Sequence, residues 1–171
     1  SGSARVLELM VEKGLNLKEK PAVPPIMARK KSTNAEWEKR LANWGNALVF
    51  TAAMCGRDAL NYDPTASSRK VRLLARAGYD VNFPRAISGD GLELTPLAAV
   101  VAEGRYQGRE SQLNVIRELL AHGAKVNAQD TDGCTPLHYA VINMDAAMVE
   151  LLLEAGADPK IADKGGDTPL A

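Results

Sequence analysis

Aromatic residues are scarce in this chain. Phe, Trp and Tyr together make up 5% of its 171 residues. Strands of β proteins favour aromatic and β-branched side chains, so this scarcity argues against a β-rich fold. The apolar share of 46% and the charged share of 25% are typical of a folded globular domain. We therefore expect a single domain whose core is aliphatic, built mainly from Leu, Ala and Val.

Cysteine is scarcer still, because Cys55 and Cys134 are the only two. Two distant cysteines exclude a disulfide-rich scaffold, and we expect free thiols in a reducing compartment. Their spacing to His122 and His138 fits no known zinc site. The chain also lacks a phosphate-binding loop, a dinucleotide-binding glycine motif and a zinc-protease motif. The sequence thus predicts no metal, no cofactor and no enzymatic activity.

An excess of either charge is also missing. The 21 basic and 21 acidic residues cancel, which leaves no overall field to attract nucleic acid or an anionic membrane. The longest apolar run, near residues 94–102, is too short to cross a bilayer. No signal peptide opens the chain, and residues 1–3 resemble a remnant of cloning, so we expect the natural ends to lie outside it. These observations predict a cytoplasmic domain that binds neither nucleic acid nor membrane.

What the chain does contain is internal repetition. The phrase Thr-Pro-Leu begins at Thr95, Thr135 and Thr168, and the last two lie 33 residues apart. Thr is a preferred N-cap and Pro fits the first helical position, so each phrase predicts the start of a helix. A glycine that ends a run of apolar residues at helical spacing predicts the end of one. Four such glycines occur: Gly14, Gly78, Gly123 and Gly156.

The unit that contains His138 carries a family resemblance. Residues 130–140 read Asp-Thr-Asp-Gly-Cys-Thr-Pro-Leu-His-Tyr-Ala, and residues 148–158 read Met-Val-Glu-Leu-Leu-Leu-Glu-Ala-Gly-Ala-Asp. This segment closely resembles the ankyrin repeat in both phrase and period. The resemblance implies an all-α solenoid of stacked helix-turn-helix units with projecting β-hairpin-like loops. It divides one domain, 4–171, into these parts: the second helix of a partial repeat (4–15), an insertion (18–45), repeats 46–82, 95–128 and 135–161, and a partial repeat (168–171).

The array is rich in insertions, and the longest has a local charge of +4 over residues 18–40. Two interpretations stay open: a basic loop that binds an acidic protein surface, or a solvated insertion whose tryptophans pack on the first repeat. The candidate residues of this loop are Lys18, Lys20, Arg29, Lys30 and Lys31. A shorter insertion at 106–114 contains no Pro, and we expect it to lengthen helices by roughly two turns.

The resemblance implies a non-catalytic module that binds another protein, or an attached domain of its own chain, through its concave face and loops. The alternative is a regulatory or targeting domain of a larger enzyme or of a secreted bacterial effector, which would act in the host cytosol. We expect the fragment to be monomeric. Carried over position by position, the candidate contacts are Met54, Leu94, Ala102, Glu103, Arg105, Thr131, Asp132, Cys134, Ile142, Asn143, Lys164 and Asp167.

Four residues of the unit that contains His138 have roles to be decided. The resemblance implies that His138 forms hydrogen bonds between loops. Ile142 and Met144 either form an exposed apolar patch, or Met144 packs inward at the turn between the helices. For Cys134, an ordinary loop cysteine is favoured over a reactive thiol.

Overall fold

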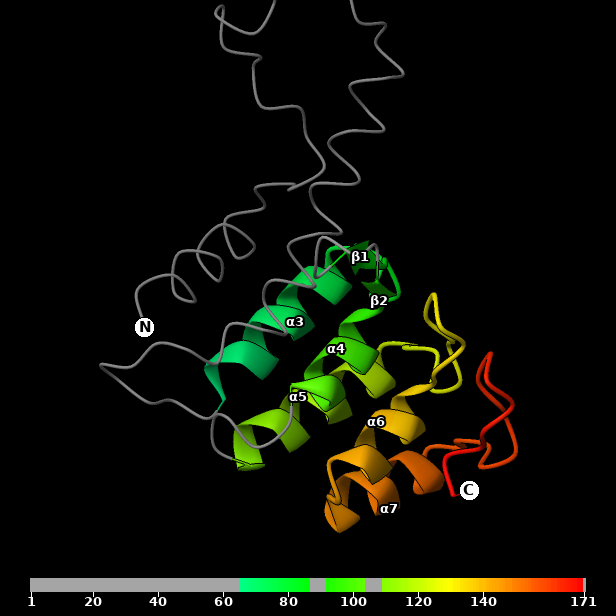
Figure 1. Ribbon diagram of the computed structural model, residues 1–171. Helices are drawn as coiled ribbons and strands as arrows, with labels where there is room; N and C mark the ends of the chain where they lie inside the picture. Colours follow the sequence, from blue (N-terminus) through cyan, green and yellow to red (C-terminus); the bar gives the residue numbers. More distant parts are fainter. Residues whose placement is uncertain (1–64, 87–91, 104–108, 171) are drawn as a thin grey trace, which may run out of the picture.

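A computed structural model of the chain describes residues 65–86, 92–103 and 109–170 (Figure 1). Its helices in these ranges are α3 (Ala66–Arg76), α4 (Pro96–Ala102), α5 (Arg109–Ala121), α6 (Pro136–Ile142) and α7 (Ala146–Glu154). Two short antiparallel strands, β1 (Arg85–Ala86) and β2 (Glu93–Leu94), pair before α4. The predicted all-α class of stacked helix pairs is confirmed, and β1–β2 is one of its hairpin loops. The predicted segments 4–15 and 18–45 lie outside the described residues.

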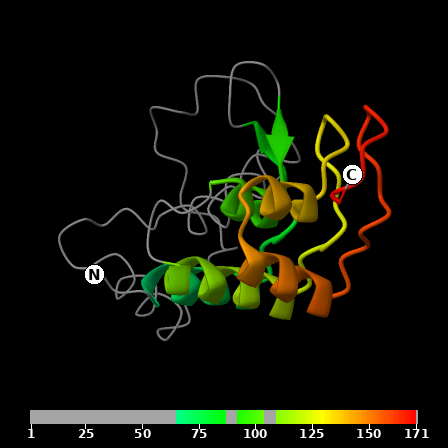
Figure 2. The same cartoon turned by 60° about the horizontal axis from the view of Figure 1, so that its bottom comes forward.

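The helices lie in two rows, which Figure 2 shows one above the other. We call α3, α5 and α7 the outer row, and α4 and α6 the inner row. α3 packs on α5, α4 packs on both α5 and α6, and α6 packs on α7. The loops that precede α6 and follow α7 project to one side, next to the inner row.

α4 and α6 start with Thr and Pro, and α3, α5 and α7 end near a glycine, as the sequence predicts. Before α4, Oγ1 of Thr95 accepts a hydrogen bond from the N–H of Ala98 at 3.3 Å, and Pro96 takes the first helical position. At the end of α5, Gly123 has φ +87°, a left-handed conformation that costs glycine little. This turn lets the N–H of Ala124 reach the carbonyl of Leu119 at 2.9 Å, which satisfies a carbonyl that the helix leaves open.

The core between the rows is aliphatic, as expected. Apolar residues spaced three and four apart turn one face of each outer helix toward the inner row. Burying such a side chain contributes roughly 1.5–3 kcal/mol. The largest fully buried apolar side chains are Val71, Leu74, Leu97, Val101, Val115, Ile116, Leu119, Leu137, Met148 and Leu152.

Successive repeats are joined by an amide clamp, a pair of hydrogen bonds made by one asparagine side chain. Asn82 donates from Nδ2 to the carbonyl of Gly123 at 3.0 Å and accepts from the N–H of Lys125 at 2.7 Å. Asn127 makes the same two bonds one repeat later, at 3.1 and 2.9 Å. The loop after each outer helix is therefore fixed to the loop of the next repeat.

Within the described residues, the insertion at 106–114 lengthens α5 at its start. α5 has 13 residues whereas α7 has 9, and α4 and α6 have 7 each. Because Ala121 and Glu154 lie 33 positions apart, the four additional residues fall at the start of α5, which is about one turn. Residues 104–108 lie outside the described part of the chain.

Candidate functional site

The loop before α6 is folded around the side chain of Asp130. Its Oδ1 accepts hydrogen bonds from the N–H groups of Asp132 at 2.8 Å and Cys134 at 2.9 Å. Asp163 does the same one repeat later, at 2.8 and 3.0 Å. A short carboxylate that satisfies nearby backbone N–H groups is the usual means by which Asp stabilises a turn. Both loop tips therefore have a defined shape without help from a partner.

The two loop tips are also bonded to each other. The N–H of Lys164 donates to the carbonyl of Asp132 at 3.0 Å. The amide of Gln129 reaches the carbonyls of Gly133 at 2.8 Å and Ala162 at 3.1 Å. Gly133 has φ +84°, and a Cβ built there would lie 2.8 Å from the nitrogen of Lys164. Glycine is therefore required at this contact for two separate reasons.

His138 connects the start of α6 to the second loop. Its Nδ1 accepts from the N–H of Thr135 at 3.0 Å and lies 2.9 Å from Oγ1 of the same residue. Because Nδ1 is an acceptor, we assign the ring proton to Nε2, which donates to the carbonyl of Asp167 at 3.2 Å. The hydrogen-bonding role that the resemblance implied for this buried histidine is confirmed.

The exposed face of α6 continues from the loop tips. Tyr139 donates from its hydroxyl to Oδ2 of Asp130 at 2.5 Å, and burial together with this bond raises the pKa of Tyr139. Ile142 lies one turn farther on and is 69% exposed, and Met144 is 83% exposed. Met144 thus does not pack inward. Asn143 differs, because its Nδ2 donates to the carbonyl of Val101 at 2.8 Å and links α6 to α4.

The predicted contact residues that the structure describes are exposed, half-buried or, in the case of Leu94, buried. Thr131, Asp132, Ile142, Lys164 and Asp167 are exposed. The half-buried members are Ala102, Glu103, Cys134 and Asn143. Met54, Arg105 and the whole basic loop (Lys18, Lys20, Arg29, Lys30 and Lys31) lie outside the described residues.

Leu94 requires a correction, since its side chain is only 2% exposed. It packs with Ala98 and Ala99 of α4. Neighbouring side chains of a strand point to opposite sides, and in β2 it is Glu93 that faces the solvent. Leu94 therefore supports the hairpin and is not available to a partner.

Cys134 is a half-buried free thiol. Burial raises the pKa of this thiol, and the carboxylates of Asp130, Asp163 and Asp132 raise it further. A reactive cysteine needs the opposite environment, one that favours the thiolate. The structure thus favours an ordinary loop cysteine. Among residues 65–86, 92–103 and 109–170, no three His, Cys, Asp or Glu side chains gather in a way that could hold a metal ion.

Sequence reasoning missed the ion pair of Arg109 and Asp145. Oδ1 of Asp145 accepts from the N–H of Met148 at 3.3 Å, which caps α7, and it also lies 2.5 Å from Nη2 of Arg109. An Asp before Ala-Ala is a visible helix-start signal. Its partner comes from the lengthened start of α5, which no local pattern indicates.

Comparison with known proteins agrees with this architecture. A family model described as ankyrin repeats, in three copies, matches residues 65–163. The chain belongs to the ankyrin-repeat family. No helix in the part of the chain that the structure describes is long and apolar enough to cross a membrane.

Relatives in the family are widespread. An Ankyrin repeat and LEM domain-containing protein 1 homolog of Caenorhabditis elegans is 53% identical over 58 residues, which is 34% of this chain and 8% of the relative. The human BCL-6 corepressor-like protein 1 is 42% identical over 129 residues, 75% of this chain and 6% of the relative. The Putative ankyrin repeat protein YahD of Escherichia coli is 36% identical over 107 residues, 58% of this chain and 47% of the relative. The chain thus spans less than half of each of these relatives.

Proposed function

We propose that this chain is a non-catalytic module that binds another protein through the inner face. This face comprises the loop tips at 130–134 and 163–167, Glu103 at the end of α4, and the exposed side of α6. Ankyrin repeats are generally protein–protein interaction modules. The observation that carries the proposal is the exposure of Ile142, 69%, on the same side of α6 as Tyr139, whose hydroxyl is bonded to the first loop.

Rigidity supports this proposal. The first loop is bonded to α6 through Asp130 and Tyr139, and the second loop is bonded to α6 through His138. A surface that is ordered before binding loses little conformational freedom when a partner arrives. The inner face is therefore suited to recognise one shape, rather than to mould itself around many.

The chemistry of the inner face indicates the kind of partner. Ile142 and Met144 offer apolar area at one end, which fits an apolar side chain of the partner. At the loop tips, the exposed carboxylates of Asp132 and Asp167 outnumber the single cation of Lys164. A partner segment with an apolar anchor and a net positive charge would match this arrangement.

Affinity capture with matched variants tests the proposal. The double variant Ile142→Arg with Glu103→Arg places two large cations on the inner face and should lose the partner that the wild type retains. The control is Leu153→Arg, which changes an apolar side chain of the outer row that is 42% exposed. Equal capture by wild type and both variants would show that the inner face is not used.

A second candidate is the basic loop of the long insertion. If capture survives the inner-face variants but is lost when residues 18–31 are deleted, this loop is the binding site. Its charge of +4 over residues 18–40 would then select an acidic surface.

The wider role we propose is that of a regulatory or targeting unit attached to other domains, in an enzyme or a secreted bacterial effector. The support is the C. elegans relative, whose name includes a LEM domain and whose matched region covers 8% of its length. This role is tested by sequencing the full gene and asking whether it encodes a catalytic domain next to the repeats. Cell fractionation tests the proposed cytoplasmic or host-cytosolic location, and light scattering tests whether the chain is a monomer.

A further inference from the structure

Every exposed residue within helix α3 is an arginine. Arg69, Arg72 and Arg76 are spaced three and four apart, which puts them on one side of the helix. The helix sequence itself contains no Asp or Glu, and Arg69 donates from Nη2 to Oγ1 of Thr65 at 3.3 Å. We call these three residues the arginine row. It lies on the outer row of helices, away from the inner face.

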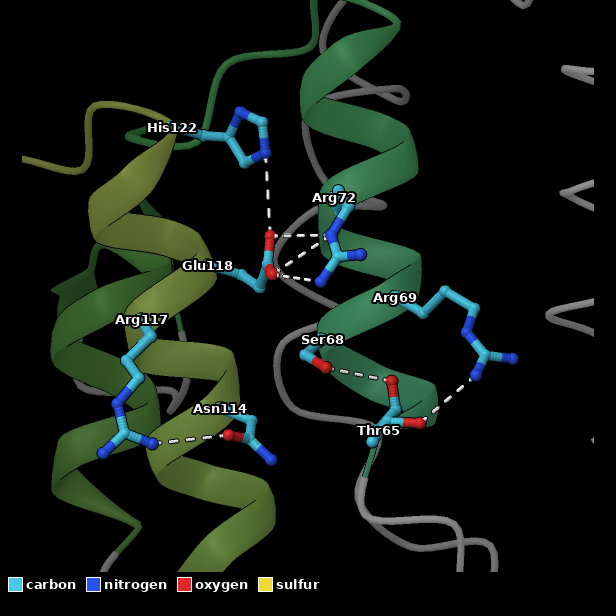
Figure 3. Close-up of polar contacts among 8 residues, drawn as sticks. All are labelled: Thr65, Ser68, Arg69, Arg72, Asn114, Arg117, Glu118 and His122. Carbon is cyan, nitrogen blue, oxygen red and sulfur yellow. Dashed lines mark hydrogen bonds and ion pairs between the residues drawn. The ribbon is translucent and has the colours of Figure 1, made fainter.

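The arginine row already holds one carboxylate of the protein itself. In Figure 3, Glu118 of α5 points at Arg72, whose Nε lies 3.1 Å from each carboxylate oxygen and whose Nη2 also bonds Oε1. Nε2 of His122 lies 3.7 Å from the other oxygen. Arg72, His122 and Arg76 all lower the pKa of Glu118. Two permanent cations therefore face a single carboxylate, which leaves an excess of positive charge.

The charge of the outer row changes from one repeat to the next. Arg72 aligns with Arg117 of α5 and with Glu150 of α7, and these residues are exposed. In the next register, Arg76 aligns with an alanine of α5 and with Glu154. The outer row is thus basic at α3 and acidic at α7. A negatively charged partner is attracted to one end and repelled from the other, which also sets its orientation.

We propose that the arginine row binds an acidic segment of a partner protein, on a surface separate from the inner face. The bonds of Arg72 to Glu118 show that the row receives a carboxylate with a paired, planar geometry. Seven residues of helix span about 10 Å, which matches carboxylates one to two turns apart on a partner helix. A nucleic acid duplex or a bilayer needs a wider basic area, and here Glu118 and the carboxylates of α7 interrupt it.

Fluorescence anisotropy with a labelled glutamate-rich peptide tests the proposal, and the same peptide with glutamines is the ligand control. Wild type should bind the glutamate peptide at low ionic strength, and added salt should weaken binding. Arg69→Gln with Arg76→Gln should weaken binding roughly fivefold to tenfold while Arg72 keeps its bonds to Glu118. The matched control is Lys125→Gln with Lys160→Gln, which removes the same charge elsewhere and should leave binding within about twofold.

Three results would overturn the proposal. One is no binding of the glutamate peptide, and another is an equal loss in the lysine control, which would indicate only overall charge. The third is that a DNA duplex or an anionic vesicle binds more tightly than the peptide and depends on the same arginines. The variant Ile142→Arg should bind the peptide normally, so this surface and the inner face can fail independently.

Discussion

Nη2 of Arg109 lies 2.5 Å from Oδ1 of Asp145 and joins the start of α5 to the start of α7. The Asp145 side chain is almost fully buried, whereas that of Arg109 is 59% exposed. The same carboxylate caps α7 through Met148. A buried carboxylate needs such partners, because an unpaired charge away from water is costly.

The two partners of this ion pair should therefore contribute unequally. We expect Asp145→Ala to lower the free energy of unfolding by about 2 kcal/mol, since it removes a helix cap and a half-buried ion pair. Arg109→Gln should cost less than about 1 kcal/mol, because its side chain is largely in water. Urea denaturation followed by circular dichroism measures both. Should Asp145→Asn, which can still cap, prove as harmful as Asp145→Ala, the cap is not the cause.

Two glycines with the same backbone conformation should respond differently to alanine. Gly123 and Gly133 have φ values of +87° and +84°, yet only at Gly133 would a Cβ meet the backbone of the next loop. We expect Gly123→Ala to cost about 1 kcal/mol, from the left-handed conformation alone. Gly133→Ala should cost at least about 2 kcal/mol, because the two loops must also separate. Thermal melting of both variants decides this, and equal costs would mean that the loops are not in contact.

Replacing Met144 with glycine should stabilise the folded protein. It has φ +50°, a left-handed conformation in a residue that is 83% exposed. Because little packing is lost, we expect Met144→Gly to raise the free energy of unfolding by roughly 0.5–1 kcal/mol. A glycine introduced inside α7, Ala147→Gly, should instead lower the free energy of unfolding by roughly 1 kcal/mol. A destabilised Met144→Gly protein in the same urea titration would contradict the assigned strain.

Glu118 should make stability depend on pH in the acid range. The hydrogen bond from Arg72 is the main reason that the pKa of Glu118 lies below its ordinary value of 4.5. The stabilisation is therefore complete above about pH 5 and is lost as the pH falls through the lowered pKa of the folded state. The difference in unfolding free energy between wild type and Glu118→Gln should shrink between about pH 5 and pH 3. Arg72→Gln should remove most of that pH dependence, since His122 and Arg76 contribute less, and an unchanged dependence would exclude this pair as the cause.

Local sequence signals predicted much of this fold. Thr and Pro before a helix and Gly after it act through backbone bonds within a few residues, so the starts of α4 and α6 follow from the phrases at Thr95 and Thr135, and the end of α7 follows from Gly156. The exposure of Ile142 was implied by the family resemblance, which places it at the end of the first helix of its repeat. In each case the decisive contacts are close along the chain.

The rest depends on contacts between repeats, which no local phrase records. The resemblance implies that Leu94 contacts a partner, but the pairing of β1 with β2 turns it inward. Arg72 and Glu118 lie 46 positions apart, on two helices separated by an insertion. Only the packing of α3 on α5 brings them together. The repeated Val-Asn at 81–82 and 126–127 was visible, yet its role as an amide clamp needs the neighbouring repeat to be in place.

The amide clamp also affects how the array comes apart. In a solenoid, cooperativity depends on the coupling between neighbours, and each clamp adds two hydrogen bonds to one junction. The third member of the series would be position 160, where the chain has Lys instead of Asn. The junction after α7 therefore lacks these two bonds, and we expect it to be less cooperative than the two clamped junctions between α3, α5 and α7.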